Sequence, residues 1–350
     1  MGLIGCLNSW WCASVRELPY PTPMYQLQKR FPFVHAIGID IGGTKIAGAV
    51  VSETGEIIAE RRIVTPDGGP DSLVDAVVEM IEALVDGHDV HAAGVAAPGF
   101  IDATQSIVYY TPNISWRQEP LRDRLRERLD LEITIDNDAN AAGWAEFRFG
   151  AGRDVSDMTM LTIGTGVGGA IVTEGRLFRG GFGAGAELGH MRVVPGGLPC
   201  GCGSKGCIEQ YGSGRALLRM ANAIADVGGI GLRMAAVREE KGSLSGDDLS
   251  ALIVEGDPGA VQALRELGSW LGQACASLSA VLDPQLFVFG GGVALAGDLL
   301  LDPIREAYRG HLPARGYHPE PEFKIAELVN NAGVVGAADL ARLHLGSSDR

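Results

Sequence analysis

The chain has 350 residues, with 29 Lys and Arg against 43 Asp and Glu, and a formal net charge of −14. This acidic balance, with no stripe of basic residues to meet phosphates, argues against a nucleic-acid-binding role. No apolar run reaches membrane-spanning length. A chain this long exceeds one ordinary hydrophobic core and predicts two domains. The 50 glycines are spaced between apolar runs, which predicts a globular protein with many tight turns.

The first 33 residues carry little pattern of regular structure. No basic region precedes the apolar residues of Met1 to Cys12, so a secretory signal is not predicted. Three prolines between residues 19 and 23 predict an extended segment. We interpret residues 1–33 as a flexible N-terminal extension, with Met24 as an alternative start of translation.

The folded body begins with a strand–turn–strand pattern. Two β-branched apolar runs, from His35 to Ile41 and through Val51, precede a third strand from Glu56 to Val64. Walker and Rossmann loops need a helix directly after their glycines, so neither motif fits. Two interpretations stay open: an ordinary tight hairpin, or a nucleotide site in which Asp40 orients a magnesium ion. In the second, the backbone near the phosphates is that of Gly42, Gly43, Thr44 and Lys45.

A first α/β half follows the hairpin. The pattern predicts a helix over Asp71 to Val85, a strand over Ala92 to Ala97, a helix over Glu119 to Leu129 and a strand over Ile133 to Asp136. The motif Asp136-Asn137-Asp138-Ala139-Asn140 then runs into a helix through Phe149. Asp138 lies where a strand ends and a helix begins, the usual place for chemistry in open α/β sheets. Aspartate is also a common helix cap, so both interpretations of Asp138 stay open.

The opening pattern is repeated after residue 158. A strand from Met160 to Gly164 turns through a glycine-rich segment into a strand ending at Thr173. The repeat predicts two facing halves with a nucleotide between them. Its phosphates would lie at Gly164, Thr165 and Gly166, and its adenosine end at a third glycine run, Gly290, Gly291 and Gly292. That run follows a strand from Leu286 to Phe289 and precedes a helix near Leu295. A long helix capped by Asp257 would hold Cys275 in the core, and residues 331–345 form the last helix.

Residues 187–209 form a metal-binding pattern. Cys200, Cys202 and Cys207 lie within eight positions, and His190 stands ten residues before the first of them. One histidine and three thiolates make a closed tetrahedral zinc site, which leaves no open position for catalysis and predicts a structural role. A disulfide or a set of buried free thiols is the alternative. A Cys200–Cys202 bridge would be strained, and nothing indicates an oxidising compartment.

The zinc would fix two carboxylates in space. Glu187 lies three residues before one ligand and Glu209 two residues after another. Two rigidly held carboxylates suit the binding of a polyol. The turns between the thiolates require glycine conformations, some with positive φ, which are supplied by Gly201, Gly203 and Gly206.

Together these motifs resemble the ROK family of sugar kinases and repressors, and most closely its zinc-containing glucokinases of actinobacterial type. The resemblance covers residues 36–343 and is carried by IGIDIGGTK, APG at Ala97 to Gly99, DNDAN, TIGTGVGG, ELGH and CGCGSKGCIE. It implies a two-domain α/β protein of the actin-like ATPase fold, a duplicated ribonuclease H-like fold with its active site in an interdomain cleft. Residues 34–137, joined by the C-terminal helix 331–345, would form the small domain, and residues 138–330 the large domain with the zinc motif.

The resemblance further implies ATP-dependent, magnesium-assisted phosphorylation of glucose to glucose 6-phosphate, with Asp138 as catalytic base. His190 can serve both zinc and sugar, because imidazole has two nitrogens. The sugar would be held by Gly99, Asn113, Asn137, Asp138, Glu187, His190 and Glu209. The alternatives are a kinase for another hexose or an N-acetylated amino sugar, or a sugar-sensing protein without turnover. The family's repressors carry a winged helix-turn-helix before this body, for which 33 residues are too few. We expect a cytoplasmic homodimer or homotetramer that binds glucose and ATP but no nucleic acid or membrane.

Overall fold

The computed structural model describes residues 34–111 and 114–345. The predicted N-terminal extension and Asn113 therefore lie outside the described residues. No helix in the described ranges is both long enough and apolar enough to cross a membrane.

The first half is built on a five-stranded sheet in the order β3-β2-β1-β4-β8. The first three strands are antiparallel, and β4 and β8 run parallel to β1. Its elements are β1 (His35–Ile41), β2 (Lys45–Val51), β3 (Ile57–Val64), α1 (Pro70–Val85), β4 (Val90–Ala97), β5 (Phe100–Ile101), β6 (Val108–Tyr110), β7 (Arg117–Glu119), α2 (Leu121–Arg126), β8 (Glu132–Asn137) and α3 (Asp138–Phe149). The strands β5, β6 and β7 form a separate small sheet.

The second half repeats the same sheet. Its order is β11-β10-β9-β12-β13, again with three antiparallel strands followed by two parallel ones. Its strands are β9 (Met158–Ile163), β10 (Val167–Thr173), β11 (Arg176–Leu177), β12 (Leu286–Gly290) and β13 (Glu322–Ile325). The repeated topology confirms the predicted α/β architecture with a duplicated ribonuclease H-like unit, as in actin-like ATPases.

Two helices of the second half, α8 (Pro258–Leu282) and α9 (Asp298–His311), pack against each other.

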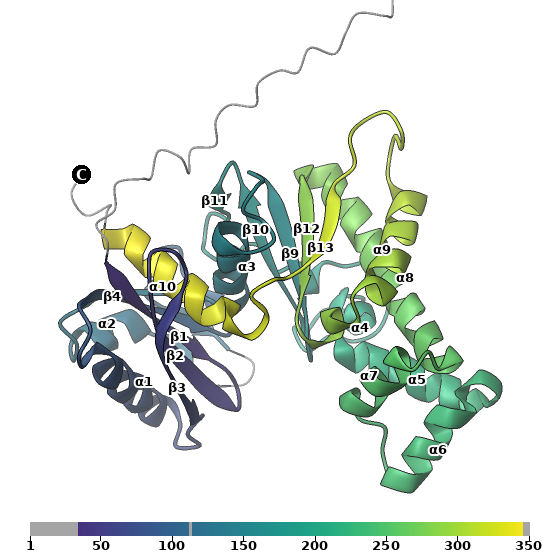
Figure 1. Cartoon of the computed structure of the whole chain (residues 1–350), viewed down its shortest axis with the longest axis horizontal. Coiled ribbons are helices and arrows are strands. Elements are labelled where there is room, and N and C mark those ends of the chain that lie inside the picture. The colour runs from purple at the N-terminus through teal and green to yellow at the C-terminus, as the bar shows by residue number, and fades with distance from the viewer. Residues whose placement is uncertain (1–33, 112–113, 346–350) are drawn as a thin grey trace, which may run out of the picture.

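The last helix, α10 (Ala332–Leu345), contacts the first half through glycines. Figure 1 shows α10 returning to lie between the strands of the first half and α3. A Cβ on Gly94 of β4 would lie 1.9 Å from the Ala337 carbonyl oxygen, and a Cβ on Gly336 1.8 Å from that of Ala141 in α3. Backbone therefore meets backbone on both sides of α10.

Separate apolar clusters stabilise the two halves. In the first, Ile37 and Ile39 of β1 pack with Leu73 and Val77 of α1. In the second, residues of β9, β12, α8 and α9 pack together around Phe287, and Cys275 is fully buried there as predicted. These cores are compatible with a boundary between residues 137 and 138, and the domain limits stay a prediction.

A helical region in the second half was not anticipated. It comprises α4 (Glu209–Gly212), α5 (Gly214–Val227), α6 (Leu232–Lys241) and α7 (Gly246–Val254). In Figure 1 the helices α5 to α7 lie at the end of the second half that is remote from the first half. Ser213 caps α5, and Ser245 with Asp248 forms a capping box that begins α7. The capping-box spacing was a readable signal for α7.

Two predicted helices differ from the structure. The helix expected over Glu119 to Leu129 is limited to α2, because Arg117–Glu119 pairs with β6 as an edge strand. The helix expected near Leu295 is a short 3₁₀ segment, Gly292–Ala296. Gly297, with φ of 59°, then separates it from α9.

The contact of α10 generates a stability prediction. We expect Gly336→Ala to lower the unfolding free energy by about 1–3 kcal/mol, because the new methyl group overlaps the Ala141 carbonyl and α10 must shift. The matched control is Gly310→Ala in α9, where a Cβ meets no atom within 4 Å. That variant should be neutral or up to about 1 kcal/mol more stable, because alanine favours helix. Denaturant unfolding measures both, and equal effects would contradict the close contact.

Candidate active site

The junction of β8 and α3 is organised by Asn137. Its Oδ1 accepts hydrogen bonds from the backbone N–H groups of Ala139 (2.9 Å) and Asn140 (3.1 Å), so Asn137 is the cap of α3. Its Nδ2 donates to the Gly99 carbonyl oxygen at 3.0 Å. Asp138 is the first helical residue, and its Oδ1 also accepts from the Ala139 N–H at 2.9 Å. The helix therefore has a cap other than Asp138, which weakens the interpretation of Asp138 as a mere cap.

The carboxylates Asp40, Asp138 and Glu187 influence one another's ionisation. Burial, and then the charge of Asp40, raises the pKa of Asp138 to about 6. Burial, and then Asp138 and Glu209, raises the pKa of Glu187 to about 7. Burial also raises the pKa of Asp40, against the opposing effect of Lys45. A half-buried carboxylate with a pKa near neutrality at the end of a strand is suited to general-base work.

Glu209 connects the metal motif to the turn between β9 and β10. Its Oε2 accepts from the Val167 N–H at 3.3 Å, and a Cβ on Gly166 would lie 2.4 Å from the same oxygen. Its Oε1 is 3.6 Å from Arg215 Nη2 and 3.9 Å from the Cys200 sulfur. One carboxylate thus contacts both the metal motif and the predicted phosphate turn.

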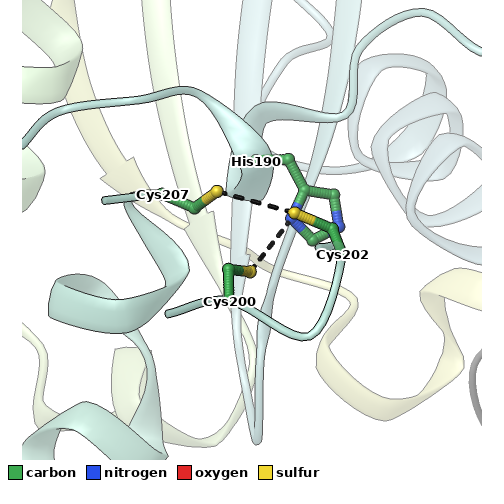
Figure 2. A group of neighbouring side chains, drawn as sticks. All are labelled: His190, Cys200, Cys202 and Cys207. Carbon is green, nitrogen blue, oxygen red and sulfur yellow. Dashed lines mark hydrogen bonds between the residues drawn. The ribbon is translucent and has the colours of Figure 1, made fainter. Parts of the chain in front are cut away.

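The four predicted metal ligands converge on one point. Their ligand atoms all lie within 4.8 Å of one another. Figure 2 shows the four side chains pointing toward one another. The sulfurs of Cys202 and Cys207 are 3.7 Å apart, and the Cys200 sulfur is 3.7 Å from His190 Nδ1. A tetrahedral zinc with Zn–S bonds of about 2.3 Å separates its sulfur ligands by about 3.8 Å, so the residues fit this ion. Burial, and then the neighbouring sulfurs, raises the pKa of Cys207 to about 12, a cost that a bound cation would remove.

Tight turns connect the thiolates. Gly203 and Gly206 have φ of 88° and 79°, and a Cβ on Gly206 would lie 1.6 Å from the Val194 carbonyl oxygen. The prediction that glycine conformations shape this motif is confirmed at these two positions. Gly201 has no positive φ, and a Cβ there would meet no described atom within 4 Å, so its predicted contribution stays a prediction.

The first glycine turn is a hairpin. The Gly42 N–H donates to the Lys45 carbonyl at 2.9 Å, and Thr65 Oγ1 donates to the Gly42 carbonyl at 2.7 Å. Gly43, Thr44 and Lys45 are exposed, and Asp40 precedes them at the end of β1. The turn is thus rigidly held by its own half, with its backbone open to a ligand.

The second glycine turn is fixed by the start of α5. The Gly164 N–H donates to the Gly166 carbonyl at 3.0 Å, and the Gly214 N–H donates to the Gly164 carbonyl at 2.8 Å. Arg215 Nε donates to the Thr165 carbonyl at 3.0 Å. The turn therefore lies against a helix N-terminus, a favourable surrounding for phosphate.

The third glycine run lies beside the second turn. Gly291 has φ of 84°, and a Cβ there would lie 2.5 Å from the carbonyl oxygen of Ile163, at the end of β9. The structure therefore brings together the two runs predicted to hold the nucleotide in the second half, which are Gly164, Thr165 and Gly166 with Gly290, Gly291 and Gly292.

Two polar residues near Asp138 were missed by the sequence analysis. Asp136 was quoted within its motif but given no role, and Arg179 was not considered. Arg179 donates to Asp136 at 2.6 Å and 2.8 Å. The available signal was Arg179 itself, a charged residue at the start of the glycine-rich stretch that precedes Glu187. The partner 43 positions away could not be read from that stretch.

Comparison with known proteins identifies close relatives. The chain is 44% identical to the glucokinase of Streptomyces coelicolor over 310 residues, which covers 87% of this chain and 97% of that protein. It is 34% identical to the N-acetylmannosamine kinase of Escherichia coli O157:H7 over 313 residues, which covers 87% and 98%. A crystal structure of a ROK family glucokinase from Streptomyces griseus, in complex with glucose and AMPPNP, is 45% identical. It has a TM-score of 0.79 and covers 88% of this chain and 99% of that chain.

A family model confirms the relationship that the motifs suggested. The match runs over residues 36–343, from β1 to the last turn of α10, and so includes both sheets and the metal motif. Together with relatives of this identity and coverage, it shows that the chain belongs to the ROK family.

Proposed function

We propose that the protein is an ATP-dependent glucokinase that transfers the γ-phosphoryl group of ATP to the 6-hydroxyl of glucose. The observation that carries this proposal is the half-buried carboxylate of Asp138. Burial, and then the charge of Asp40, raises the pKa of Asp138 to about 6, and the charge of Asp138 in turn contributes to the raised pKa of Glu187. The relatives named glucokinase and the complex of one with glucose and AMPPNP support the same activity.

The sugar is assigned to the carboxylate side of the site. Glu187 and Glu209 accept hydrogen bonds from sugar hydroxyls, and Asn137 lies beside Asp138. Because His190 Nδ1 faces the Cys200 sulfur, its Nε2 is left for the sugar. Asp138 takes the proton of the attacking hydroxyl as the oxygen–phosphorus bond forms. Asn113, which lies outside the described residues, stays a predicted sugar contact.

The nucleotide is assigned to the glycine turns. The open backbone at Gly42 to Lys45 and the turn at Gly164 to Gly166 bind phosphate oxygens, and Gly290 to Gly292 bind the adenosine end. Asp40 is the residue that would hold magnesium. When bound, this ion supplies positive charge that offsets the charge of the transferring group. The thiolate and imidazole cluster holds a structural zinc. A cytoplasmic location and a homodimer or homotetramer stay predictions.

A kinase for an N-acetylated amino sugar is the second candidate, because the chain is 34% identical to an N-acetylmannosamine kinase. A coupled ADP-release assay over glucose, mannose, fructose, N-acetylglucosamine and N-acetylmannosamine tests both. We expect the highest kcat/KM with glucose. Sugar binding by calorimetry without ADP release would instead indicate a sugar sensor.

The variant Asp138→Asn should show whether Asp138 acts as a catalytic base or has only a structural role. The amide keeps the shape of the side chain but cannot take the proton, so kcat should fall by roughly 10²- to 10⁴-fold. Glucose affinity, measured by calorimetry, should change little. The matched control Asp130→Asn, at an exposed position, should keep full turnover. Near-normal turnover of Asp138→Asn would refute the assignment.

The raised pKa of Asp138 also predicts pH-dependent stability. The pKa lies at about 6 in the folded protein against an ordinary 3.8, so the folded state disfavours the charged form. Wild type is therefore destabilised relative to Asp138→Asn above about pH 6, and this difference fades as the pH falls toward 4. Calorimetric melting at pH 8, 6 and 4 should show a higher Tm for the variant only at the upper values. A constant difference at all three values would contradict the raised pKa.

Zinc should be bound at about one ion per chain and should support the sugar site. Cys202 is exposed, so Cys202→Ala removes a ligand without opening a core cavity. We expect loss of the metal and a fall in glucose affinity of about tenfold or more, because Glu187 and Glu209 lose their shared anchor. Elemental analysis and calorimetry measure both effects. Cys275→Ala, away from the cluster, should keep the metal, and a metal-free Cys202→Ala protein with full sugar affinity would overturn the role.

A further inference from the structure

A buried ion pair joins the two halves beside the candidate base. Asp136 is the next-to-last residue of β8 in the first half, whereas Arg179 follows β11 of the second half. Arg179 Nε and Nη2 both donate to Asp136 Oδ2, at 2.8 Å and 2.6 Å. The side chains are 4% exposed for Asp136 and 24% for Arg179. Charge-assisted hydrogen bonds of this length in a buried setting hold their partners in one orientation.

The same carboxylate organises the start of α3. Asp136 Oδ1 accepts from the Asn137 N–H at 2.9 Å and from Asn140 Nδ2 at 3.0 Å. Gln105 Nε2 donates to Oδ2 at 2.9 Å. Two of these partners, Asn137 and Asn140, lie on either side of Asp138 in the sequence. The orientation of the Asp136 carboxylate therefore sets the turn that presents the candidate base.

The loop that begins at Arg179 carries Glu187. Gly183 of this loop has φ of 86°, and a Cβ there would lie 2.4 Å from the Ile101 carbonyl oxygen, so the loop meets the backbone of the first half. Ala186 has φ of 64°, and its carbonyl accepts from the Leu188 N–H at 2.7 Å. A non-glycine residue in this conformation is strained and persists only where its surroundings hold it. Arg179 supplies an anchor at the start of the loop.

We propose that Arg179 is a positioning residue for phosphoryl transfer, which acts through Asp136 to hold Asp138 in register with the loop that carries Glu187. This inference rests on the proposed kinase function. Arg179 itself takes no proton and transfers no group. Its contribution is the fixed relative placement of two carboxylates, Asp138 directly after β8 of the first sheet and Glu187 in the loop after β11 of the second, on which the alignment of the hydroxyl depends.

The test compares steady-state kinetics of wild type, Arg179→Gln and Arg179→Lys. We expect Arg179→Gln to lower kcat by about 10- to 100-fold with little change in the KM for ATP. Arg179→Lys should recover only part of this loss, because an ammonium does not reproduce the fixed geometry in which two guanidinium N–H groups donate to Asp136 Oδ2. The matched control is Arg153→Gln, which breaks an exposed pair with Glu327. It should retain wild-type kcat.

A second variant separates positioning from stability. Arg179→Gln leaves the buried Asp136 charge unpaired, which can unfold the protein. The double variant Asp136→Asn with Arg179→Gln removes that charge and should regain most of the Tm. We expect its kcat to stay at least about tenfold below wild type. Recovery of kcat together with Tm would show a purely structural pair and overturn the proposal, as would full kcat in a folded Arg179→Gln protein.

The proposed function is tested separately in the same series. If wild type releases no ADP with any sugar, the kinase proposal fails before Arg179 is assessed. If wild type is active and both Arg179 variants match it, the kinase proposal stands and the positioning role fails. Glucose affinity by calorimetry gives a readout that does not depend on turnover. Arg179→Gln should weaken that affinity by a few fold, because Asn137 directly follows Asp136 and the loop that begins at Arg179 carries Glu187.

Discussion

The close contact of α10 with its neighbours is the constraint on which the site depends. Gly336 meets the backbone of Ala141 in α3, and a Cβ on Gly333 would lie 2.5 Å from the Asp40 carboxylate. One helix thus contacts both β1, the strand that carries Asp40, and α3, the helix that begins with Asp138. Burial, and then the charge of Asp40, raises the pKa of Asp138, so the packing of α10 against both elements bears on this pKa.

Crowding of carboxylates opposes folding, and the rest of the molecule must offset it. Asp40, Asp138 and Glu187 all have raised pKa values because burial disfavours their charged forms. The two apolar cores and the backbone contact of α10 stabilise the fold and so offset the unfavourable burial of these carboxylates. Such local destabilisation is common at active sites, because charged groups that bind substrate are poorly solvated as long as no substrate is bound.

The sequence predicted the parts of the site whose signals are local. The metal ligands lie within a short glycine-rich stretch, and the repeated strand–turn–strand pattern revealed the duplicated sheets. The roles of Asn137 and Asp138 could not be separated by sequence, because both residue types cap helices and only the hydrogen bonds of Asn137 distinguish them. The pair of Asp136 and Arg179 was missed because it depends on tertiary contact. The helices within residues 214–254 were also missed, although the amphipathic pattern of α5 and the capping box at Ser245 and Asp248 were readable local signals.

Glu209 shows why a metal remote from phosphate chemistry can still matter to it. Its carboxylate lies two residues after Cys207 and contacts the turn at Gly166. That turn is also held by the start of α5, where the Gly214 N–H donates to the Gly164 carbonyl. Glu209 and α5 belong to one short segment, and Glu209 Oε1 lies 3.6 Å from Arg215 Nη2, so the two supports of the turn are coupled. Glu209, which is assigned to the sugar, therefore also helps to fix the geometry of the predicted phosphate turn. If the cluster holds zinc and the turn holds phosphate, as proposed above, loss of the ion would affect the nucleotide side through Glu209.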